Sequence, residues 1–181
     1  MKLALYLPNF RDSIAVQEID ELASVAEELD FDSLWTLDRI IVPEVSDRAE
    51  LEQSFGSMDQ FPSALPVTSR GEWLQGLPLI PYLAATTKKI RLGVSIIVTP
   101  FRAPATMAAE IATWDQLSRG RINVGVGAGW MPEEFDAMGV DYKLRGKLTD
   151  EHLELYKVAC DDPTPEFQGE HTSISGKVFF P

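Results

Sequence analysis

Four short apolar segments, each followed by a helical pattern, constrain the fold of this chain more than any other feature. The segments are Leu3–Pro8, Ser33–Leu37, Ile90–Val98 and the strand within Ser118–Trp130. The sequences that follow predict helices over Ser13–Leu29, Pro78–Thr87, Pro104–Ser118 and Thr149–Cys160, the last of them capped by Thr149. Strands that alternate with helices in this way form a parallel sheet, so we expect an α/β protein.

Two parallel folds accommodate these units: half of a (β/α)8 barrel, which usually takes about 250 residues, or an open doubly wound sheet. The first strand is expected to be fully buried, and Val16, Ile19, Val25, Leu29, Met107 and Leu117 are among the side chains expected to face the sheet. The stretch over 40–73 is too long for an ordinary connection and predicts a loop over the site. A small hairpin is expected over Phe167–His171 and Ser173–Phe180.

Glycine is concentrated in the fourth segment, SRGRINVGVGAGW, which is Ser118–Trp130. Gly120 is expected to end a helix, and the small and apolar residues after it predict a strand buried on both faces. Gly125, Gly127 and Gly129 would let the backbone approach a flat or charged group. Their spacing matches neither the dinucleotide fingerprint nor a phosphate-binding loop, so a merely structural turn is an equal alternative.

Polar and aromatic residues follow each of the four segments. Because ligand sites of parallel α/β folds lie beyond the C-terminal strand ends, these residues should gather in one place. They are Asn9 and Phe10, Asp38 and Arg39, Val98 and Thr99, and Gly127–Trp130. Asp38 and Arg39 fit either a structural ion pair or a ligand site, and Trp130 fits either a core or a site wall. Glu133 and Glu134 are expected on the solvated start of a helix.

Composition disfavours several classes of function. The formal net charge of −12 argues against nucleic acid and anionic membrane as partners. Cys160 is the only cysteine and is expected in the core, so an internal disulfide is excluded and a cytoplasmic location is predicted. His152 and His171, the only histidines, lack further ligands at metal-binding spacing, so no metal site is expected. No segment has the pattern of a signal peptide or a membrane span.

The order and wording of several segments resemble the luciferase-like monooxygenase family of barrel oxidoreductases, which use FMN or the deazaflavin coenzyme F-420. The resemblance rests most on LSRGRINVGVGAGWMPEEFDAMGV, with support from TKKIRLGVSIIVTPFRAP, FDSLWTLD and FQGEHTSISGKVFFP. It decides for a (β/α)8 TIM barrel, with about the first four strand–helix units and a C-terminal hairpin present in a single domain over 1–181. It implies an oxidoreductase that transfers a hydride between cofactor and a small organic substrate, with or without oxygen insertion. The GAGW wording favours F-420 over FMN.

The resemblance also implies roles for individual residues. The family's strand-end aspartate falls on Asp38, close to the cofactor ring. In many members a histidine follows it, whereas here the residue is Arg39, which stays charged and cannot readily act as a general base. We therefore expect Asp38 to position or polarise and Arg39 to orient an anionic group.

A platform for the cofactor ring is the other implication. Relatives carry a cis peptide bond behind the ring, and the corresponding bond joins Ser95 to Ile96. The expected platform residues are Ser95, Ile96, Gly127, Ala128, Gly129 and Trp130. Trp130 stands where the sugar-phosphate dehydrogenase branch has glutamate, so that particular reaction is not expected.

Half a barrel would leave its inner face and two sheet edges exposed. We therefore expect this chain to be part of a longer one or to pair with a second copy as a homo-oligomer. Loops after the seventh and eighth strands, which often bind phosphate in barrels, would lie outside it. The competing hypothesis is a non-catalytic half barrel that binds cofactor weakly or not at all and serves as an assembly partner.

Overall fold

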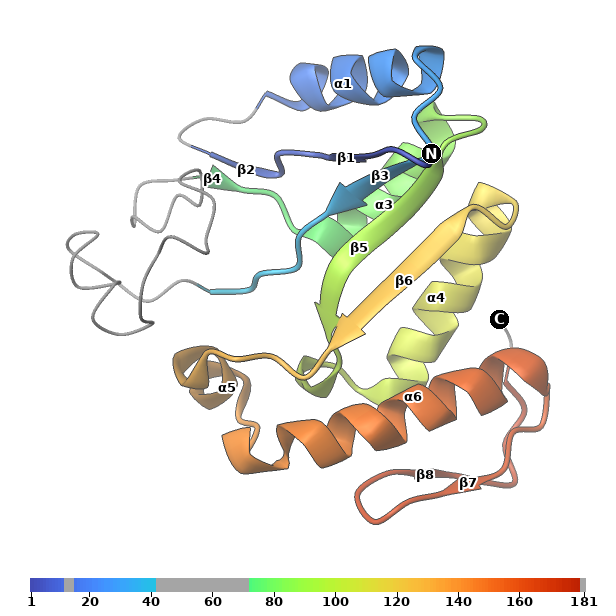
Figure 1. Ribbon diagram of the computed structural model, residues 1–181. Coiled ribbons are helices and arrows are strands. Elements are labelled where there is room, and N and C mark those ends of the chain that lie inside the picture. The colour runs from blue at the N-terminus through green and yellow to red at the C-terminus, as the bar shows by residue number, and fades with distance from the viewer. Residues whose placement is uncertain (12–14, 42–71, 180–181) are drawn as a thin grey trace.

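The computed structural model describes residues 1–11, 15–41 and 72–179, in which four parallel strands form the central sheet (Figure 1). Their order across the sheet is β1 (Ala4–Tyr6), β3 (Ser33–Thr36), β5 (Arg91–Val98) and β6 (Ile122–Gly127). Every neighbouring pair is parallel. The predicted parallel α/β sheet is therefore confirmed, and β5 lies inside it, as its β-branched residues indicate.

A long helix connects or follows each of these strands. The four are α1 (Val16–Glu28), α3 (Gly76–Thr86), α4 (Pro104–Ser118) and α6 (Arg145–Asp161). The predicted stop at Gly120 is confirmed, because Arg119 and Gly120 adopt positive φ angles of 62° and 80° directly after α4. Three short helices lie near the C-terminal strand ends: η2 (Thr99–Phe101), α5 (Pro132–Met138) and η3 (Tyr142–Leu144). None of the described helices combines the length and apolar character needed to cross a membrane.

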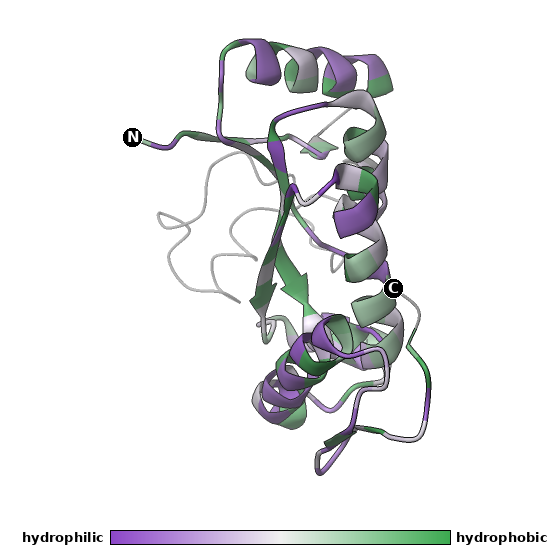
Figure 2. Cartoon of the chain, turned by 90° about the vertical axis from the view of Figure 1, so that its right-hand side faces the viewer, coloured by the Kyte–Doolittle hydropathy of each residue, from purple (hydrophilic) through white to green (hydrophobic). Residues whose placement is uncertain are grey.

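The helices pack along one face of the sheet, which Figure 2 shows nearly edge-on. The core between them combines Leu34, Leu92, Val94 and Ile97 of the strands with Ile19, Ile80, Met107, Ala108 and Leu155 of the helices. Fully burying one large side chain of this kind stabilises the fold by about 1.5–3 kcal/mol. This layer holds the strands in register and so fixes the places where they end.

The opposite face of the sheet is less covered by the described residues. Tyr6 on β1 and Ile96 on β5 are 40% and 37% exposed, and Trp35 lies across Gly93 on the neighbouring strand. The predictions of a fully buried first strand and a β6 buried on both faces are therefore wrong. The reason is that β1 and β6 are the outer strands, each paired along one edge within the described residues.

The predicted inner faces of the helices are partly right. Ile19, Ala26, Met107 and Ala108 are buried as expected. Val16, Val25, Leu29 and Leu117 are exposed instead, while Ala23 and Trp114 are buried without having been predicted. In α1 the buried positions follow one narrow stripe at helical spacing, so the assumed apolar face was too wide.

Two expectations for α6 are wrong. Thr149 does not cap the helix but lies within it, where its hydroxyl donates to the Arg145 carbonyl oxygen at 2.7 Å and accepts from the Thr99 hydroxyl at 3.1 Å. Cys160 is exposed rather than in the core, whereas its neighbour Ala159 is 1% exposed, so the two residues lie on different sides of the helix. Thr149 thereby ties α6 to the end of β5 instead of starting the helix.

Two small antiparallel pairs complete the described structure. The predicted C-terminal hairpin is confirmed, with β7 (Phe167–Gln168) paired to β8 (Ser173–Ile174). At the other end, β2 (Phe10–Arg11) pairs with β4 (Glu72–Trp73). Most of the predicted loop over 40–73, namely residues 42–71, lies outside the described residues.

Arg121 and Glu27 tie together the amino-terminal end of the sheet. The Arg121 guanidinium donates to the carbonyl oxygens of Thr87 and Ile90 at 3.2 and 2.7 Å. The Glu27 carboxylate accepts hydrogen bonds from the backbone amides of residues 88–90. Burial alone raises the pKa of Glu27, but these amides and Arg121 outweigh it and lower the pKa. This end of the sheet is thus occupied by structural contacts, unlike the end described below.

The close contact between β5 and β6 at Gly125 gives a stability prediction. A Cβ at Gly125 would come within 2.6 Å of the Val94 carbonyl oxygen, which belongs to the backbone and cannot rotate away. We expect Gly125→Ala to lower the free energy of unfolding by about 1–3 kcal/mol, as for other overpacked sites. Gly146→Ala in α6 is the control, because a Cβ there meets no atom within 4 Å. Urea unfolding of the two variants would contradict this reading if both lost the same stability.

Candidate functional site

The carboxyl ends of all four strands meet at one end of the sheet (Figure 1). Asp38 and Arg39 follow β3, Thr99 follows β5, and Trp130 comes shortly after β6. α5 and η3 fill the connection from β6 to α6 at the same end. These residues therefore lie at one end of the sheet, as the parallel fold predicts.

Asp38 does not pair with its neighbour Arg39. Its carboxylate receives both terminal nitrogens of Arg102, at 2.6 and 2.7 Å, and the Val98 amide at 3.3 Å. The Asp38 side chain is only 1% exposed and that of Arg102 19%. A buried, bidentate pair of this kind fixes the orientation of the carboxylate. The structural ion pair between Asp38 and Arg39 considered from the sequence is therefore corrected to one between Asp38 and Arg102.

Arg39 instead pairs with Glu134, at 2.9 Å. Glu134 lies in the first turn of α5, and its carboxylate also accepts the backbone amides of Ile40 at 2.9 Å and Ile41 at 3.4 Å. The side chain is 4% exposed, so the expectation of a solvated Glu134 is wrong, whereas Glu133 beside it is exposed. The difference arises because the helical turn directs Glu134 inward to Arg39.

The indole of Trp130 forms the rim of the site. It is 43% exposed, which rules out a place in the core, and the Arg39 guanidinium carbon lies 5.2 Å from the ring centroid. This distance is typical of a cation–π contact. The Tyr142 hydroxyl donates to the Trp130 carbonyl oxygen at 3.1 Å and so ties η3 to the same backbone.

The bond between Ser95 and Ile96 is cis, as the family resemblance implied. The pairing of β5 with β6 shifts register between Val94 and Ile97, both of which are buried in the helical layer. Ser95 and Ile96 consequently both lie exposed on the other face of the sheet. An apolar side chain and a hydroxyl therefore stand near the strand ends without a described covering.

The glycines at the end of β6 lie where a side chain would not fit. A Cβ at Gly127 would collide with the Ile96 side chain. Gly129 has a φ of +78°, and a Cβ there would lie 2.7 Å from Val98 Cγ1 and 2.8 Å from the Phe135 ring. These glycines thus let the turn pack directly against Ile96, Val98 and Phe135.

Asn9 joins three segments at the same end. Its buried amide donates to the carbonyl oxygens of Leu37 and Leu74 at 3.0 and 2.7 Å, and it accepts the Leu37 amide at 3.0 Å. Next to it, Phe10 stacks on Trp73 with 4.7 Å between ring centroids. The sequence predicts both residues at this end. Asn9 ties the end of β1 to the end of β3, and Phe10 packs β2 on β4.

A buried histidine lies beneath the end of β5. His152 of α6 is 4% exposed, and its Nδ1 lies 3.1 Å from the Thr99 carbonyl oxygen. Burial lowers the pKa of His152, although the Thr99 carbonyl and Glu151 act in the opposite direction. Within the described ranges, no group of three histidine, cysteine or acidic side chains is placed to hold a metal ion.

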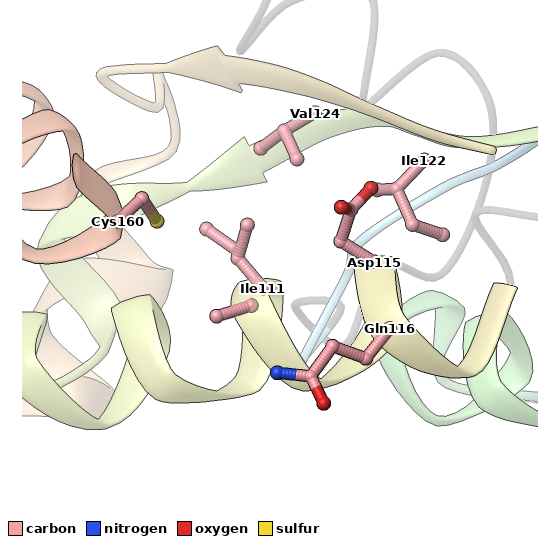
Figure 3. A pocket seen from close by; sticks show the side chains of 7 residues that line it. Ile111, Asp115, Gln116, Ile122, Val124 and Cys160 are labelled. Carbon is pink, nitrogen blue, oxygen red and sulfur yellow. The ribbon is translucent and has the colours of Figure 1, made fainter. Parts of the chain in front are cut away.

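A groove of about 400 Å³ between α4, α6 and the outer side of β6 lies away from these residues (Figure 3). Ile111, Asp115, Gln116, Ile122, Val124 and Cys160 line it. Burial, together with Asp161 and Asp115, raises the pKa of the Cys160 thiol, which disfavours the reactive thiolate. None of the strand-end residues contributes to this groove, so it is not the candidate site.

The sequence does not predict Arg102 and Glu134 as the ion-pair partners of Asp38 and Arg39. Arg102 lies after the short helix η2, a few positions beyond the end of β5. The sequence places Glu133 and Glu134 alike at the start of a helix, so it does not indicate which of the two turns inward. A wider window after each strand would have included Arg102, whereas only the direction of the α5 turn separates the two glutamates.

Comparisons with known proteins agree with this architecture. A sequence profile described as "Luciferase-like monooxygenase" matches residues 1–181. An uncharacterized protein of Mycobacterium tuberculosis is 30% identical over 161 residues, which are 84% of this chain and 51% of that protein. The chain thus spans about half the length of the curated relatives it matches.

Two solved structures share the fold. An F420-dependent secondary alcohol dehydrogenase in complex with an F420-acetone adduct has a TM-score of 0.73 and 20% identity, and the match covers 99% of this chain and 48% of the enzyme. The FMN-bound oxygenating constituent of 3,6-diketocamphane monooxygenase from Pseudomonas putida has a TM-score of 0.67 and 19% identity, with 97% and 43% covered. The predicted TIM-barrel type, of which this chain supplies four parallel strands, is therefore confirmed.

The Asp38–Arg102 pair predicts a large effect of one substitution. Arg102→Met would leave the 1% exposed Asp38 carboxylate without its cation, which we expect to cost about 3–5 kcal/mol in urea unfolding. Asp38→Asn combined with Arg102→Met should recover part of this loss, since no charge remains buried. Lys147→Met removes the cation of an exposed pair with Glu170 and should cost at most about 1 kcal/mol. Equal losses for Arg102→Met and Lys147→Met would contradict the assignment.

His152 predicts a dependence of stability on pH. Because its pKa is lowered in the folded chain, the unfolded chain binds the proton more readily below about pH 6.5. The free energy of unfolding should therefore fall as pH falls from about 7 towards 5.5, and His152→Gln should reduce this slope. An unchanged slope in His152→Gln would contradict this assignment. Denaturant titrations at several pH values decide between these outcomes.

Proposed function

The chain belongs to the luciferase-like monooxygenase family, and from this premise we propose that its strand-end site takes part in a flavin-type oxidoreductase reaction. The cofactor we propose is the deazaflavin coenzyme F-420 in preference to FMN, and the substrate a small organic molecule. The observation that carries the proposal is the partial exposure of two apolar side chains near the strand ends, Ile96 and Trp130, with the Arg39 cation 5.2 Å from the Trp130 ring centroid. A flat, conjugated and partly anionic group fits such a surface.

Six residues would hold the ring of the cofactor. They are Ser95, Ile96, Gly127, Ala128, Gly129 and Trp130. Ser95 and Ile96 are supported by their exposure beside the cis bond, and Trp130 by its exposed indole. For Gly127 and Gly129 the support is indirect, since their missing side chains face protein and keep the turn low. The cofactor, when bound, supplies the hydride-transfer chemistry, and these residues orient it and exclude water from one face.

Asp38 acts in this proposal through its charge and position. Its carboxylate is saturated by Arg102 and the Val98 amide, so a proton-transfer role would first require that pair to open. A fixed negative charge next to a positive one provides a preorganised dipole, which can stabilise charge that develops on a nearby ring without reorganisation. We therefore assign Asp38 to positioning and polarisation rather than to acid–base chemistry.

Arg39 is the cation proposed to orient an anionic group of cofactor or substrate. One terminal nitrogen is engaged by Glu134, and a guanidinium has five N–H donors in all. Its side chain is 19% exposed, which leaves part of the fork accessible from the Trp130 side.

The whole barrel is part of the proposal as well. The outer edges of β1 and β6 carry no described partner strand, and the relatives are about twice as long as this chain. We propose that further strands, from a longer chain or from a second copy, pair with these edges and supply the rest of the site wall. The assembly-partner hypothesis remains the alternative, and cofactor binding distinguishes the two.

A fluorescence titration tests cofactor binding. We expect saturable quenching of tryptophan emission by coenzyme F-420, weaker quenching by FMN, and loss of most of the response in Trp130→Phe. Trp114→Phe is the matched control, because this indole is buried in α4, away from the strand ends. It should retain the response to ligand. Absence of saturable quenching by either ligand would favour the assembly partner, and unchanged turnover in Asp38→Ala would remove Asp38 from the site.

A further inference from the structure

We propose that Glu134 is a positioning residue that holds Arg39 over Trp130 and thereby sets the geometry of the site rim. The inference rests on the proposed function for its consequence in ligand binding, but not for the contact itself. It concerns a carboxylate that touches neither the proposed ring platform nor the Asp38 pair. Its described hydrogen-bond and ion-pair partners all belong to the segment that leaves β3.

The carboxylate of Glu134 is used completely by that segment. One oxygen accepts the amides of Ile40 and Ile41, at 2.9 and 3.4 Å, and the other accepts the Arg39 guanidinium at 2.9 Å. Only 4% of the side chain is exposed, so the carboxylate is screened from water. A buried charge needs several hydrogen-bond partners to offset the loss of water. Three consecutive residues after β3 are thus bound by one side chain.

α5 fixes Glu134 in place from the other side. Phe135, the next residue, is 0% exposed and packs edge-on against Phe101 and Tyr142, with centroid distances of 4.7 and 5.2 Å. Met131, just before the helix, is also buried, and its sulfur lies 3.6 Å from the Arg39 guanidinium. Glu134 therefore approaches Arg39 from a packed element and not from a free loop.

Arg39 has no comparable partner elsewhere among its described contacts. Its backbone carbonyl accepts the Gln75 side-chain amide at 2.6 Å, which holds the main chain, whereas its guanidinium contacts Glu134, Met131 and the Trp130 ring. Asp38, the residue before Arg39, forms its ion pair with Arg102. Of these neighbours only Glu134 carries the opposite charge, so it decides the direction of the guanidinium.

The consequence is that Glu134 acts on the ligand through two other residues. A guanidinium fixed 5.2 Å from the indole centroid restrains the ring that forms the rim and keeps its own remaining donors turned to the site. Without the charge of Glu134, Arg39 can take other rotamers and Trp130 loses its stacked cation. A ligand would then have to order both side chains on binding, at a cost in affinity.

Glu134→Gln is the test variant, with Glu133→Gln as the matched control one position away on the exposed side of the same turn. The first readout needs no ligand. We expect Glu134→Gln, but not Glu133→Gln, to make Trp130 more accessible to acrylamide, with the Trp130 signal taken as the difference from the same variant carrying Trp130→Phe. Urea unfolding of each variant establishes that it is folded at the assay temperature.

A double-substitution cycle shows whether the effect passes through Arg39. If it does, Glu134→Gln should change the Trp130 signal in the original chain but cause no further change in an Arg39→Met background. Additive effects, or a Glu134→Gln variant whose Trp130 signal equals that of Glu133→Gln, would overturn the proposal. Arg39→Met alone keeps the test decisive if Glu134→Gln fails to fold, since it must then reproduce the increased accessibility.

Titration with coenzyme F-420 and with FMN supplies the second readout. We expect Glu134→Gln to weaken binding of the preferred ligand about tenfold, as loss of a charged hydrogen bond does, and Glu133→Gln to leave it unchanged. If neither ligand binds the original chain, the proposed function fails while the accessibility measurement still decides the role of Glu134. If ligand binds the Glu134→Gln variant with unchanged affinity, the inferred effect of Glu134 on the site is wrong.

Discussion

The ion pair between Asp38 and Arg102 is the interaction on which the strand-end architecture depends. It joins Asp38, two residues after β3, to Arg102, which directly follows η2, and the Val98 amide on the same carboxylate adds the end of β5. A charge at 1% exposure is costly to bury, so the arrangement is stable only while both partners keep this geometry. The ends of two adjacent strands are thereby held at a fixed separation. Of the residues proposed to meet a ligand, Arg39, Ser95 and Ile96 lie on backbone that these strands carry.

The second pair, between Arg39 and Glu134, extends this framework from β3 to the connection after β6. The Asn9 amide binds the same segment through the carbonyl oxygen of Leu37 and also binds that of Leu74. The turn after β3 is therefore held by Asn9 as well as by Glu134. At the opposite end of the sheet, Arg121 and Glu27 bind backbone carbonyls and amides directly. The two ends therefore differ. At the amino-terminal end the charged side chains bind backbone groups, whereas at the carboxyl end they also orient other side chains around an exposed surface.

Much of the fold followed from the sequence, because the strand and helix periods are local properties. α4 begins at Pro104 and ends at Ser118 as predicted, and β5 ends at Val98, since proline and glycine mark those boundaries through backbone geometry alone. The partners of Asp38 and Arg39 could not be predicted in this way. They lie 64 and 95 residues along the chain, and which carboxylate meets which guanidinium depends on how α5 and η2 turn. The exposure of β1 and β6 likewise depends on their place at the sheet edges, which no single segment records.

The identity of residue 39 also constrains residue 134. A histidine at position 39 could lie near a ring as a neutral imidazole without a counter-charge. A guanidinium in that place is a permanent cation, and at 19% exposure it needs a carboxylate to offset the loss of water. Glu134 supplies it, and its own burial is tolerated for the same reason. A change of either residue alone is therefore costly: a neutral histidine at 39 would leave the buried carboxylate without its cation, and a neutral residue at 134 would leave the guanidinium beside Trp130 without its carboxylate.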